Sequence, residues 1–343
     1  MKRGDIRSGM SPLFVFMITK DKIRGMFLGV FLGDAIGCPV ESWPADKIRN
    51  TYGCLDICVP PTLHKYFFAD NQGTYTDDTQ LTLVVAKSII ESDLDVQKLA
   101  ENHVLALKQS IRGWGTSTRE SIRRIANGCS FLESGNSSGV GNGIAMKIAP
   151  VGAYQACQTE LEALAKVDAY ILQLTEMTHK TSVALASAFV MVEAVKYCFV
   201  NEFKADEFIF RIQNTALQVE NSYLKPLWKD NLSDPLKKLE NYKKMSYEDI
   251  ISIFGQGTCY CYNSIPFSLA FFLKNPFSSD AMIAAINSGG DTDSNGSIVG
   301  GLVGALNGES VFPKKMIKSL DQQQLEEVMN VADAYYLKLC EFF

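Results

Sequence analysis

The chain has 343 residues, of which 47% are hydrophobic and 21% charged, a composition that supports a sizeable core and excludes wholesale disorder. That length allows one large domain or two small ones. The 33 Lys and Arg residues are outnumbered by 38 Asp and Glu residues, so the chain has no broad basic surface and nucleic acid is excluded as a main partner.

The first 20 residues are predicted to form an N-terminal extension, and the folded domain is predicted to occupy residues 21–343. Basic residues precede an apolar run from Leu13 to Ile18, but this run is shorter than that of a signal peptide and no A-x-A site follows it. We therefore expect a cytoplasmic protein, with export by an uncleaved signal as the open alternative.

Helical periodicity dominates the rest of the chain and predicts an all-α domain. The longest apolar stretch, Val183 to Val200, contains Glu193 and Lys196, which indicates a buried helix and not a membrane span. Seven segments place apolar residues three and four positions apart: Thr79–Glu91, Leu94–Arg112, Glu160–Leu174, Ser182–Phe199, Ala205–Val219, Asp280–Ile286 and Gln322–Leu339.

Glycines recur at every fourth residue in two segments near opposite ends of the chain. Such a stripe occupies one helix face and costs about 1 kcal/mol per residue relative to alanine, so close packing between two helix backbones must offset it. If the two helices touch, Asp34 and Glu41 lie near the residues that precede Gly296; loop glycines are the alternative. The stripes are Gly25, Gly29, Gly33 and Gly37, and Gly296, Gly300, Gly304 and Gly308.

The segment Thr76-Asp77-Asp78-Thr79 places two carboxylates and two hydroxyls at the start of a predicted helix. Residues of this kind often only cap a helix. Together with a second oxygen-rich cluster they could instead hold one or two divalent cations, because helix amides help to keep the carboxylates ionised.

Three further features concern connections and thiols. Residues 221–247 are richer in Lys, Asn and Pro than their surroundings, which predicts an exposed connection or insertion. The nine cysteines are scattered without a C-x-x-C pair, so we expect reduced thiols. The three histidines, His64, His103 and His179, do not stand at zinc-finger spacing from a cysteine pair.

The second acidic cluster is Gly289-Gly290-Asp291-Thr292-Asp293-Ser294-Asn295-Gly296. Two carboxylates one residue apart, beside a hydroxyl and after two glycines, suit a hard cation. Oxygen ligands of this kind favour Mg²⁺ or Mn²⁺ over zinc. A calcium-binding loop of the EF-hand type is the alternative, but Leu302 stands where that loop needs a bidentate Glu.

Five short motifs follow one another along roughly residues 22–313. They are Gly33-Asp34-Ala35-Ile36-Gly37 with Glu41, Thr76-Asp77-Asp78-Thr79, Gly141-Asn142-Gly143 with Ala145-Met146 and Pro150, Thr178-His179, and Gly289-Gly290-Asp291-Thr292-Asp293. In this order they resemble the ADP-ribosylglycohydrolase family. The resemblance implies a single compact orthogonal helical domain with a binuclear Mg²⁺ or Mn²⁺ centre at the base of a cleft that binds ADP-ribose.

The resemblance also implies a role for each matching residue. Carried over by position, the metal ligands are Thr76, Asp77, Asp78, Asp291, Asp293 and Ser294, and the residues that carry the reaction are Glu41, Asp77 and Asp293. The implied lining of the ADP-ribose site is Gly141, Asn142, Gly143, Met146 and His179, with a core histidine as the alternative for His179. The chain departs from the family's usual pattern at Ser294, where Thr is usual, and at Lys147, where Arg is common.

The implied activity is hydrolysis of the glycosidic bond at ribose C1, which removes ADP-ribose from a protein side chain. The patterns around Arg112–Thr118, Gly255–Gly257 and Ser264–Pro266 favour an arginine linkage. Serine-linked ADP-ribose, O-acetyl-ADP-ribose, an ADP-ribosylated nucleobase and a catalytically silent ADP-ribose-binding protein are the alternatives. We expect a monomer that binds neither nucleic acid nor membrane.

Overall fold

The computed structural model describes residues 18–222 and 229–343, and these residues form helices without a β-strand, which confirms the predicted all-α fold class. Most of the predicted N-terminal extension lies outside the described residues, and the first described helix begins at Lys20, after the N-cap Thr19. The helices are α2 (Lys20–Gly37), α3 (Ala45–Tyr52), α4 (Asp77–Ser92), α5 (Val96–Gln109), α6 (Thr116–Ala126), α7 (Ala149–Ala156), α8 (Leu161–Glu176), α9 (Ser182–Val200), α10 (Ala205–Ser222), α11 (Ser233–Lys237), α12 (Tyr247–Phe254), α13 (Cys261–Lys274), α14 (Asp280–Asn287), α15 (Thr292–Asn307), α16 (Lys314–Ser319) and α17 (Gln322–Leu339).

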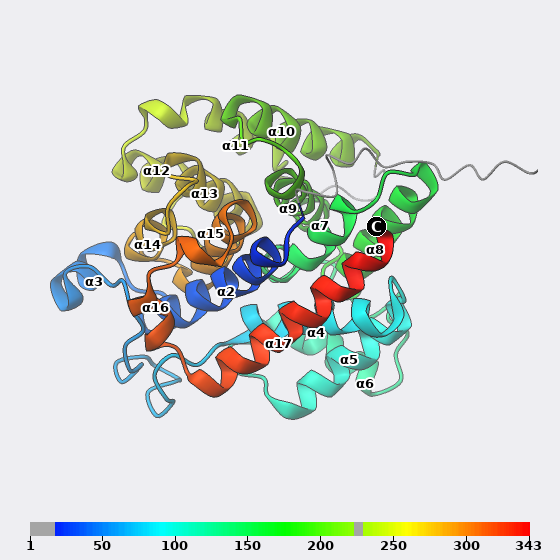
Figure 1. The fold of residues 1–343 in the computed structure, drawn as a ribbon, viewed down its shortest axis with the longest axis horizontal. Helices are drawn as coiled ribbons and strands as arrows, with labels where there is room; N and C mark the ends of the chain where they lie inside the picture. The colour runs from blue at the N-terminus through cyan, green and yellow to red at the C-terminus, as the bar shows by residue number, and fades with distance from the viewer. Residues whose placement is uncertain (1–17, 223–228) are drawn as a thin grey trace, which may run out of the picture.

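The backbones of α2 and α15 are in direct contact at the centre of the molecule (Figure 1). A Cβ atom on Gly29 would lie 2.0 Å from the carbonyl oxygen of Gly300, and one on Gly33 would lie 2.2 Å from that of Gly296. No side chain fits at such distances, because protein interiors are already close-packed. The contact confirms the prediction that the two glycine stripes pack against each other.

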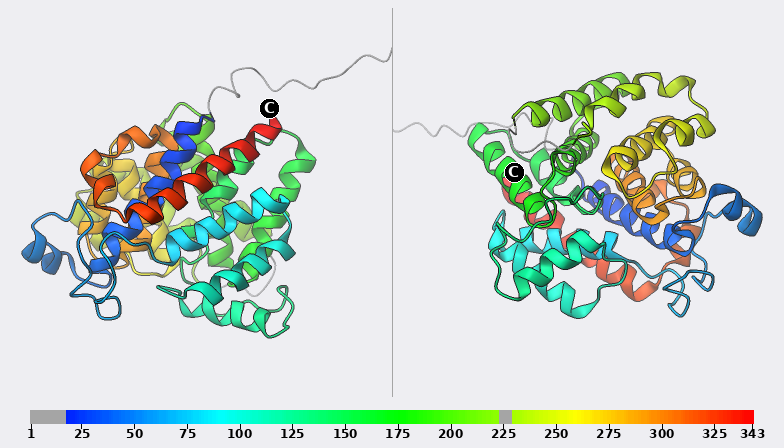
Figure 2. Two further views of the ribbon diagram at one scale, coloured as in Figure 1. Left: turned by 60° about the horizontal axis from the view of Figure 1, so that its bottom comes forward. Right: turned by 180° about the vertical axis from the view of Figure 1, so that it is seen from behind.

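The other helices surround this central pair (Figures 1 and 2). On one side α2 also packs against α17, which lies on α4, and α5 packs between α4 and α6. On the other side α7 and α10 pack against α9, while α13 and α14 pack against α15. The C-terminal end of α2, the N-terminal end of α15 and the N-terminal end of α4 thereby come together at one place.

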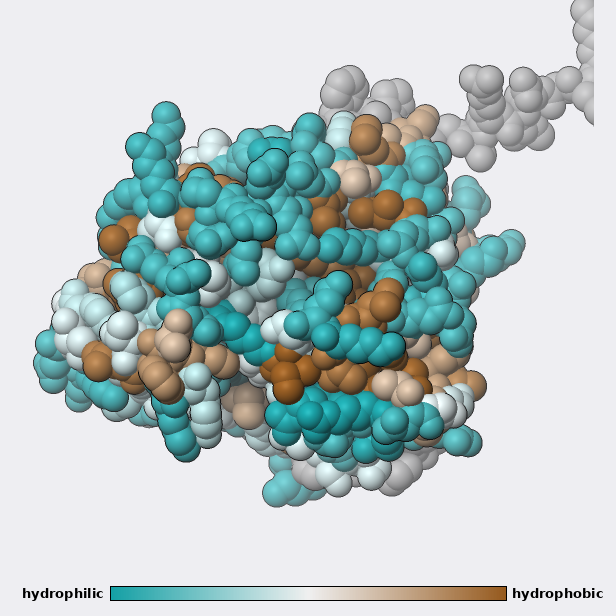
Figure 3. All heavy atoms as spheres, turned by 90° about the horizontal axis from the view of Figure 1, so that it is seen from below, coloured by the Kyte–Doolittle hydropathy of each residue, from teal (hydrophilic) through white to brown (hydrophobic). Residues whose placement is uncertain are grey.

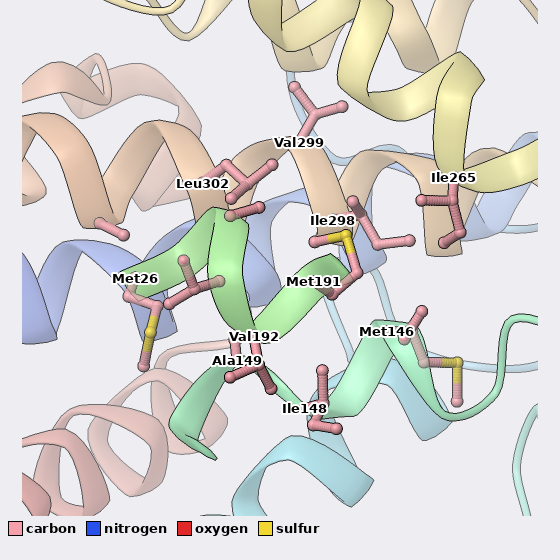
Figure 4. Close-up of a cluster of buried hydrophobic side chains, with 14 of the residues drawn as sticks. Met26, Met146, Ile148, Ala149, Met191, Val192, Ile265, Ile298, Val299 and Leu302 are labelled. Atoms are coloured by element: carbon pink, nitrogen blue, oxygen red, sulfur yellow. The ribbon is translucent and has the colours of Figure 1, made fainter. Parts of the chain in front are cut away.

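A continuous apolar core runs between these helices. Figure 4 shows part of it, in which Met26 of α2 and Met191 of α9 lie near Ile298 and Leu302 of α15. Figure 3 shows one outer face, where hydrophilic side chains predominate and hydrophobic side chains gather in small groups between them. The burial of apolar side chains on both sides of the α2–α15 pair fixes the helix ends that carry the acidic residues.

Two described helices are long and apolar enough to cross a membrane, Lys20–Val40 and Ser182–Val200. In the most apolar 18-residue stretch of each helix, 94% and 78% respectively are buried inside the protein. Buried core helices meet the same criteria, so these helices give weak support for a membrane span and agree with the burial predicted for Val183–Val200.

The exposed insertion expected at residues 221–247 stays a prediction, and the part that the structure describes combines exposed polar residues with buried leucines. Leu232, Leu236 and Leu239 are fully buried along α11 and the following 3₁₀ helix, Lys238–Lys244. The charged residues between these leucines face solvent. They make the average composition of the segment polar, and this average does not reveal the regular spacing of the leucines. Residues 223–228 lie outside the described residues.

Candidate functional site

Glu41 stands on the short connection that follows α2, directly after the 3₁₀ helix Cys38–Val40. The Ser42 amide donates to the Gly290 carbonyl at 2.7 Å, and the Gly290 amide donates to the Trp43 carbonyl at 3.0 Å. These two hydrogen bonds tie the Glu41 connection to the turn that precedes α15. Glu41 and the acidic cluster that follows Gly290, more than 200 residues apart in the chain, are therefore neighbours.

The turn before α15 requires glycine. Gly289 and Gly290 have φ values of +80° and +85°, in the left-handed region. A Cβ atom on Gly290 would also lie 1.5 Å from the Gln256 carbonyl oxygen, so no side chain fits there. The next amide, that of Asp291, donates to the Gly257 carbonyl at 3.0 Å and fixes the first acidic residue at the start of α15.

Three carboxylates meet at this point. Glu41, Asp291 and Asp293 each offer an oxygen within 4.8 Å of the other two. Asp293 is buried, whereas Asp291 is half-buried and the Glu41 side chain is 34% exposed. Asn142 donates from Nδ2 to Oδ2 of Asp291 at 2.6 Å, which orients that carboxylate. A compact set of carboxylates that is open on one side suits a hard cation.

Asp34 joins α2 to the acidic segment Thr76–Thr79 at the start of α4. Its carboxylate accepts from the amides of Thr76 and Thr79 at 2.9–3.0 Å and from their hydroxyls at 2.6 and 2.7 Å. These amides are among the unpaired donors of the first turn of α4, so a buried side chain of α2 caps that helix. The contact places Asp77 and Asp78 beside the end of α2.

Asp77 and Asp78 face the same region from the start of α4. Oδ1 of Asp77 lies against Gly113, where a Cβ atom would stand 2.3 Å from it and where φ is +83°. Ser294 Oγ lies 3.5 Å from Oδ2 of Asp78, which links the two acidic motifs across the site. The predicted ligands are thus brought to one place, although the hydroxyl of Thr76 donates to Asp34.

Burial and mutual repulsion disfavour the ionised form of these carboxyls. Burial is the main cause that raises the pKa of Asp77 to about 8, and the charge of Asp34 adds to it. Burial also raises the pKa of Asp291 to about 6, with Glu41 as the next cause. The pKa values of Asp78 and Asp293 are raised well above the ordinary range, again chiefly by burial. A bound cation would offset this repulsion.

The residues present fit a divalent cation. Oδ1 of Asp78 is buried and has no hydrogen-bond partner among the described residues, so one carboxylate oxygen is left for a ligand. The surrounding donors are carboxylates and hydroxyls, and neither a histidine nor a cysteine belongs to the predicted ligand set. Such oxygen donors favour Mg²⁺ or Mn²⁺ over Zn²⁺.

The glycine-rich loop at residues 139–143 closes the site from another side. The Asn142 amide donates to the Cys259 carbonyl at 2.7 Å, and its side chain donates to Ser264 Oγ at 3.0 Å as well as to Asp291. Ser264 in turn donates to Asn295 of α15 at 2.9 Å. This network connects the loop to both α13 and α15, so Asn142 supports Asp291 in addition to its predicted place in the ADP-ribose site.

Two predicted substrate residues are buried beneath this loop. His179 lies under the glycines, 2% exposed, with Nδ1 at 2.8 Å from Thr178 Oγ1, as the core-histidine alternative describes. Met146 is also buried, and its sulfur lies 3.8 Å from Ser294 Oγ. Contacts of this kind support the loop and the acidic cluster from within the core.

Lys147 is fully buried next to Met146, and its Nζ has no hydrogen-bond partner among the described residues. Burial lowers the pKa of this lysine to about 8, while the charge of Asp77 raises it. Its positive charge also helps burial to lower the pKa values of His103 and His179 to about 3. A fixed cation of the protein therefore stands near the acidic cluster.

Several supporting residues were not found from the sequence. From the sequence, Asp34 was expected only to lie near the residues that precede Gly296. A carboxyl in a buried apolar helix needs hydrogen-bond donors that are also buried. This rule could have identified Asp34 as a residue that binds another segment of the chain. Ser264 and Asn295 gave no separate signal. His64 also gave none, although it contacts Glu41.

Comparisons with known proteins match nearly the whole chain to one family. A family model described as ADP-ribosylglycohydrolase matches residues 17–341. The chain is 24% identical over 320 residues to the ADP-ribosyl-[dinitrogen reductase] glycohydrolase of Rhodospirillum rubrum, covering 92% of this chain and 95% of that protein. It is 23% identical over 327 residues to the ADP-ribosylarginine hydrolase Tri1 of Serratia proteamaculans, covering 92% and 79%.

A solved structure, described as an ADP-ribosylglycohydrolase-related protein complex, has a similar fold. Its TM-score is 0.64 at 22% sequence identity, and the match covers 93% of this chain and 98% of the other. The all-helical arrangement is thus shared along nearly the whole length of both chains.

Proposed function

The chain belongs to the ADP-ribosylglycohydrolase family and is an ADP-ribosyl hydrolase, and on this premise we propose that it removes arginine-linked mono-ADP-ribose from modified proteins. The observation that carries the proposal is the meeting of Glu41 with Asp291 and Asp293 at a partly open cluster. The reaction breaks the bond between ribose C1 and the acceptor nitrogen, and water adds to C1.

Two divalent cations, Mg²⁺ or Mn²⁺, belong to this proposal. A bound cation of this kind polarises a water molecule and grips hydroxyl oxygens. The support is the donor set and the unpaired buried oxygen of Asp78. The residues that would hold the cations are Thr76, Asp77, Asp78, Asp291, Asp293 and Ser294.

Glu41 is the residue proposed to move the proton. Its side chain is 34% exposed, so a substrate can reach it. It acts as a base toward the attacking water or as an acid toward the leaving group. Asp77 and Asp293 act from deeper in the site, where they hold the charge that orients the ribose.

The glycine loop is proposed to bind the ADP-ribose moiety. A Cβ atom on Gly141 would make only ordinary contacts, with the Cys259 carbonyl oxygen at 3.7 Å and His179 Nε2 at 3.9 Å, so the loop backbone packs closely on the protein here. Glycine amides of such a loop are the groups proposed to bind the diphosphate or ribose. Asn142 and Met146 contact Asp291 and Ser294 respectively, and His179 supports the loop from below.

The proposed arginine linkage rests on the sequence pattern and on the name of one relative. Arg112-Gly113-Trp114 borders the acidic cluster, since Gly113 packs against Asp77. One relative is named an ADP-ribosylarginine hydrolase and another an ADP-ribosyl-[dinitrogen reductase] glycohydrolase. The proposed partner is accordingly an ADP-ribosylated protein, and we propose a cytoplasmic monomer that acts without nucleic acid or membrane.

The experiment is a comparison of linkages under one condition. Purified protein with Mg²⁺ is given arginine-linked, serine-linked and O-acetyl-linked ADP-ribose, and free ADP-ribose is measured. We expect release from the arginine-linked substrate at a rate at least about 10-fold above the others. Preferential cleavage of another linkage overturns the arginine assignment, whereas ADP-ribose binding without any release indicates a silent binder.

A further inference from the structure

One hydrogen bond to Glu41 comes from a loop that has no assigned role. Nε2 of His64 lies 3.3 Å from Oε2 of Glu41. The His64 side chain is only 5% exposed, although it belongs to the long connection between α3 and α4. A buried polar ring beside the exposed carboxylate requires an explanation, because histidine loses hydration when it is buried.

The hydrogen bonds of His64 define its tautomer. The amides of Tyr66 and Phe67 both donate to Nδ1, each at 3.1 Å. Nδ1 is therefore an acceptor and carries no proton. In a neutral imidazole the proton then resides on Nε2, which faces Glu41 and donates to its carboxylate.

The ring is held in place on its other sides. His64 stacks on Phe67 with ring centroids 4.5 Å apart and planes 3° from parallel. The Arg112 guanidinium lies 4.7 Å from the centre of the Phe67 ring and pairs with Asp70 at 2.5 Å. Arg112 also donates to the carbonyl of Tyr75, just before α4, so the loop is anchored to the same helix that carries Asp77.

The backbone at Glu41 does not by itself fix the carboxylate. The next residue, Ser42, has a φ of +65°, an uncommon conformation for a non-glycine residue, and its amide is bound to Gly290. These contacts fix the main chain but leave the side-chain torsions of Glu41 free. Among the described residues, it is the His64 side chain that lies within hydrogen-bonding distance of this carboxylate.

We propose that His64 is a positioning residue for Glu41: its Nε2–H holds the carboxylate toward Asp291 and Asp293 while Nδ1 is fixed by the loop amides. This inference deepens the proposed function, because it depends on Glu41 as the proton-moving group. It predicts that the loop at residues 61–70 affects the reaction through the orientation of Glu41 and not through contact with ADP-ribose.

The first test measures the tautomer and needs no catalysis. The chain has three histidines, so ¹⁵N-histidine spectra of the full chain contain three rings, and the His64→Asn spectrum assigns the missing one. We expect the Nε2–H tautomer for His64, with an Nε2 proton that exchanges slowly with water and is lost from the spectrum in Glu41→Ala. An Nδ1–H ring, or a spectrum unchanged by Glu41→Ala, overturns the proposal.

The second test separates the two nitrogens of the ring by substitution. The amide oxygen of Asn stands near the place of Nδ1, and the amide nitrogen of Gln near that of Nε2. We therefore expect His64→Asn to lower kcat about 10-fold with KM and ADP-ribose affinity within about twofold, and His64→Gln to restore most of kcat. Equal losses in both variants, or a loss confined to KM, contradict a positioning role.

Controls separate this proposal from loss of fold and from failure of the proposed function. Phe68→Ala changes an exposed residue of the same loop and is expected to leave kcat unchanged. In a Glu41→Gln background, His64→Asn should cause no further loss, since the two residues act as a unit. If the wild-type protein releases no ADP-ribose from any linkage, the proposed function fails, while the tautomer spectra still decide whether His64 binds Glu41.

Discussion

Glu41 is a partly exposed carboxylate of the cluster, and its Oε2 lies within hydrogen-bonding distance of His64 on a separate loop. The Glu41→Gln substitution keeps the size of the side chain and a hydrogen-bonding oxygen but removes the group that carries a proton. We expect kcat to fall at least about 100-fold, while ADP-ribose binding measured by calorimetry changes by less than about threefold. The matched control is Glu202→Gln, an exposed carboxyl between α9 and α10, which should keep full turnover. Near-normal turnover in Glu41→Gln would remove Glu41 from the reaction.

Lys147, a single buried residue, leads to a prediction about stability. Its pKa is lowered to about 8 by burial, whereas an unfolded lysine keeps its proton to about pH 10. Between these values the unfolded chain binds more protons, so this residue makes the free energy of unfolding rise with pH. We expect the Lys147→Met variant to be more stable than the wild type at pH 7.5 and to lose up to about 3 kcal/mol of that advantage by pH 10.

The measurement is urea denaturation of both proteins across that pH range. The change with pH in the stability difference between the two proteins is informative, because an exposed lysine with an ordinary pKa would not produce it. Parallel pH profiles for the two proteins would show that the buried ammonium has an ordinary pKa.

At the scale of elements, the contact between α2 and α15 determines where the acidic residues meet. A Cβ atom on Gly29 would lie 2.0 Å from a backbone oxygen of α15, and a backbone cannot move aside as a side chain can. We expect Gly29→Ala to destabilise the protein by at least about 3 kcal/mol, despite the better helix propensity of alanine. Thermal unfolding measures this.

The control is Gly115→Ala, since a Cβ atom on Gly115 would meet no atom within 4 Å. Gly115 is the N-cap of α6, so alanine should cost about 1 kcal/mol or less there. An equally small effect of Gly29→Ala would show that the two helix backbones are not in close contact.

The same elements show what a sequence can and cannot predict here. The four-residue glycine period and the helical apolar spacing are local patterns, so the fold class and the α2–α15 contact followed from them. Helix α13 was missed because Pro266 lies inside it, where proline normally disfavours a helix. The buried leucines in and around α11 were missed because polar neighbours dominated the composition of their segment.

The site was predictable in part for the same reason. Asp77, Asp78, Asp291 and Asp293 stand in short motifs, and the helix contact brings the two motifs together. The contact between His64 and Glu41 depends on a loop without regular secondary structure, and no periodicity indicates where such a loop packs. The roles of these residues in binding and catalysis stay predictions.

For the whole molecule, the cation-free cluster is a source of instability that depends on pH. The folded-state pKa values of Asp77 and Asp291 are raised, to about 8 and about 6, so their contribution to stability is complete below about pH 4 and is lost as pH rises through those values. Under the proposed function, a bound Mg²⁺ would take the place of the protons. We therefore expect saturating Mg²⁺ to raise the Tm more at pH 8 than at pH 6.

The variant Asp78→Asn checks this prediction, because it removes one of the mutually repelling carboxylates. With a chelator at pH 8 it should be as stable as the wild type or more so, and it should lose most of the rise in Tm with Mg²⁺. A rise in Tm that is the same at both pH values and in the variant would place the cation elsewhere.

The most direct measurement is the release of free ADP-ribose from an arginine-ADP-ribosylated protein by the wild type and by Asp291→Ala, each with Mg²⁺ and with a chelator. If Glu41, the start of α4 and the start of α15 form one hydrolytic site, the wild type releases ADP-ribose only with Mg²⁺, and Asp291→Ala releases almost none while it remains folded. Release that persists with the chelator, or in the variant, would contradict the assignment of the reaction to this acidic cluster.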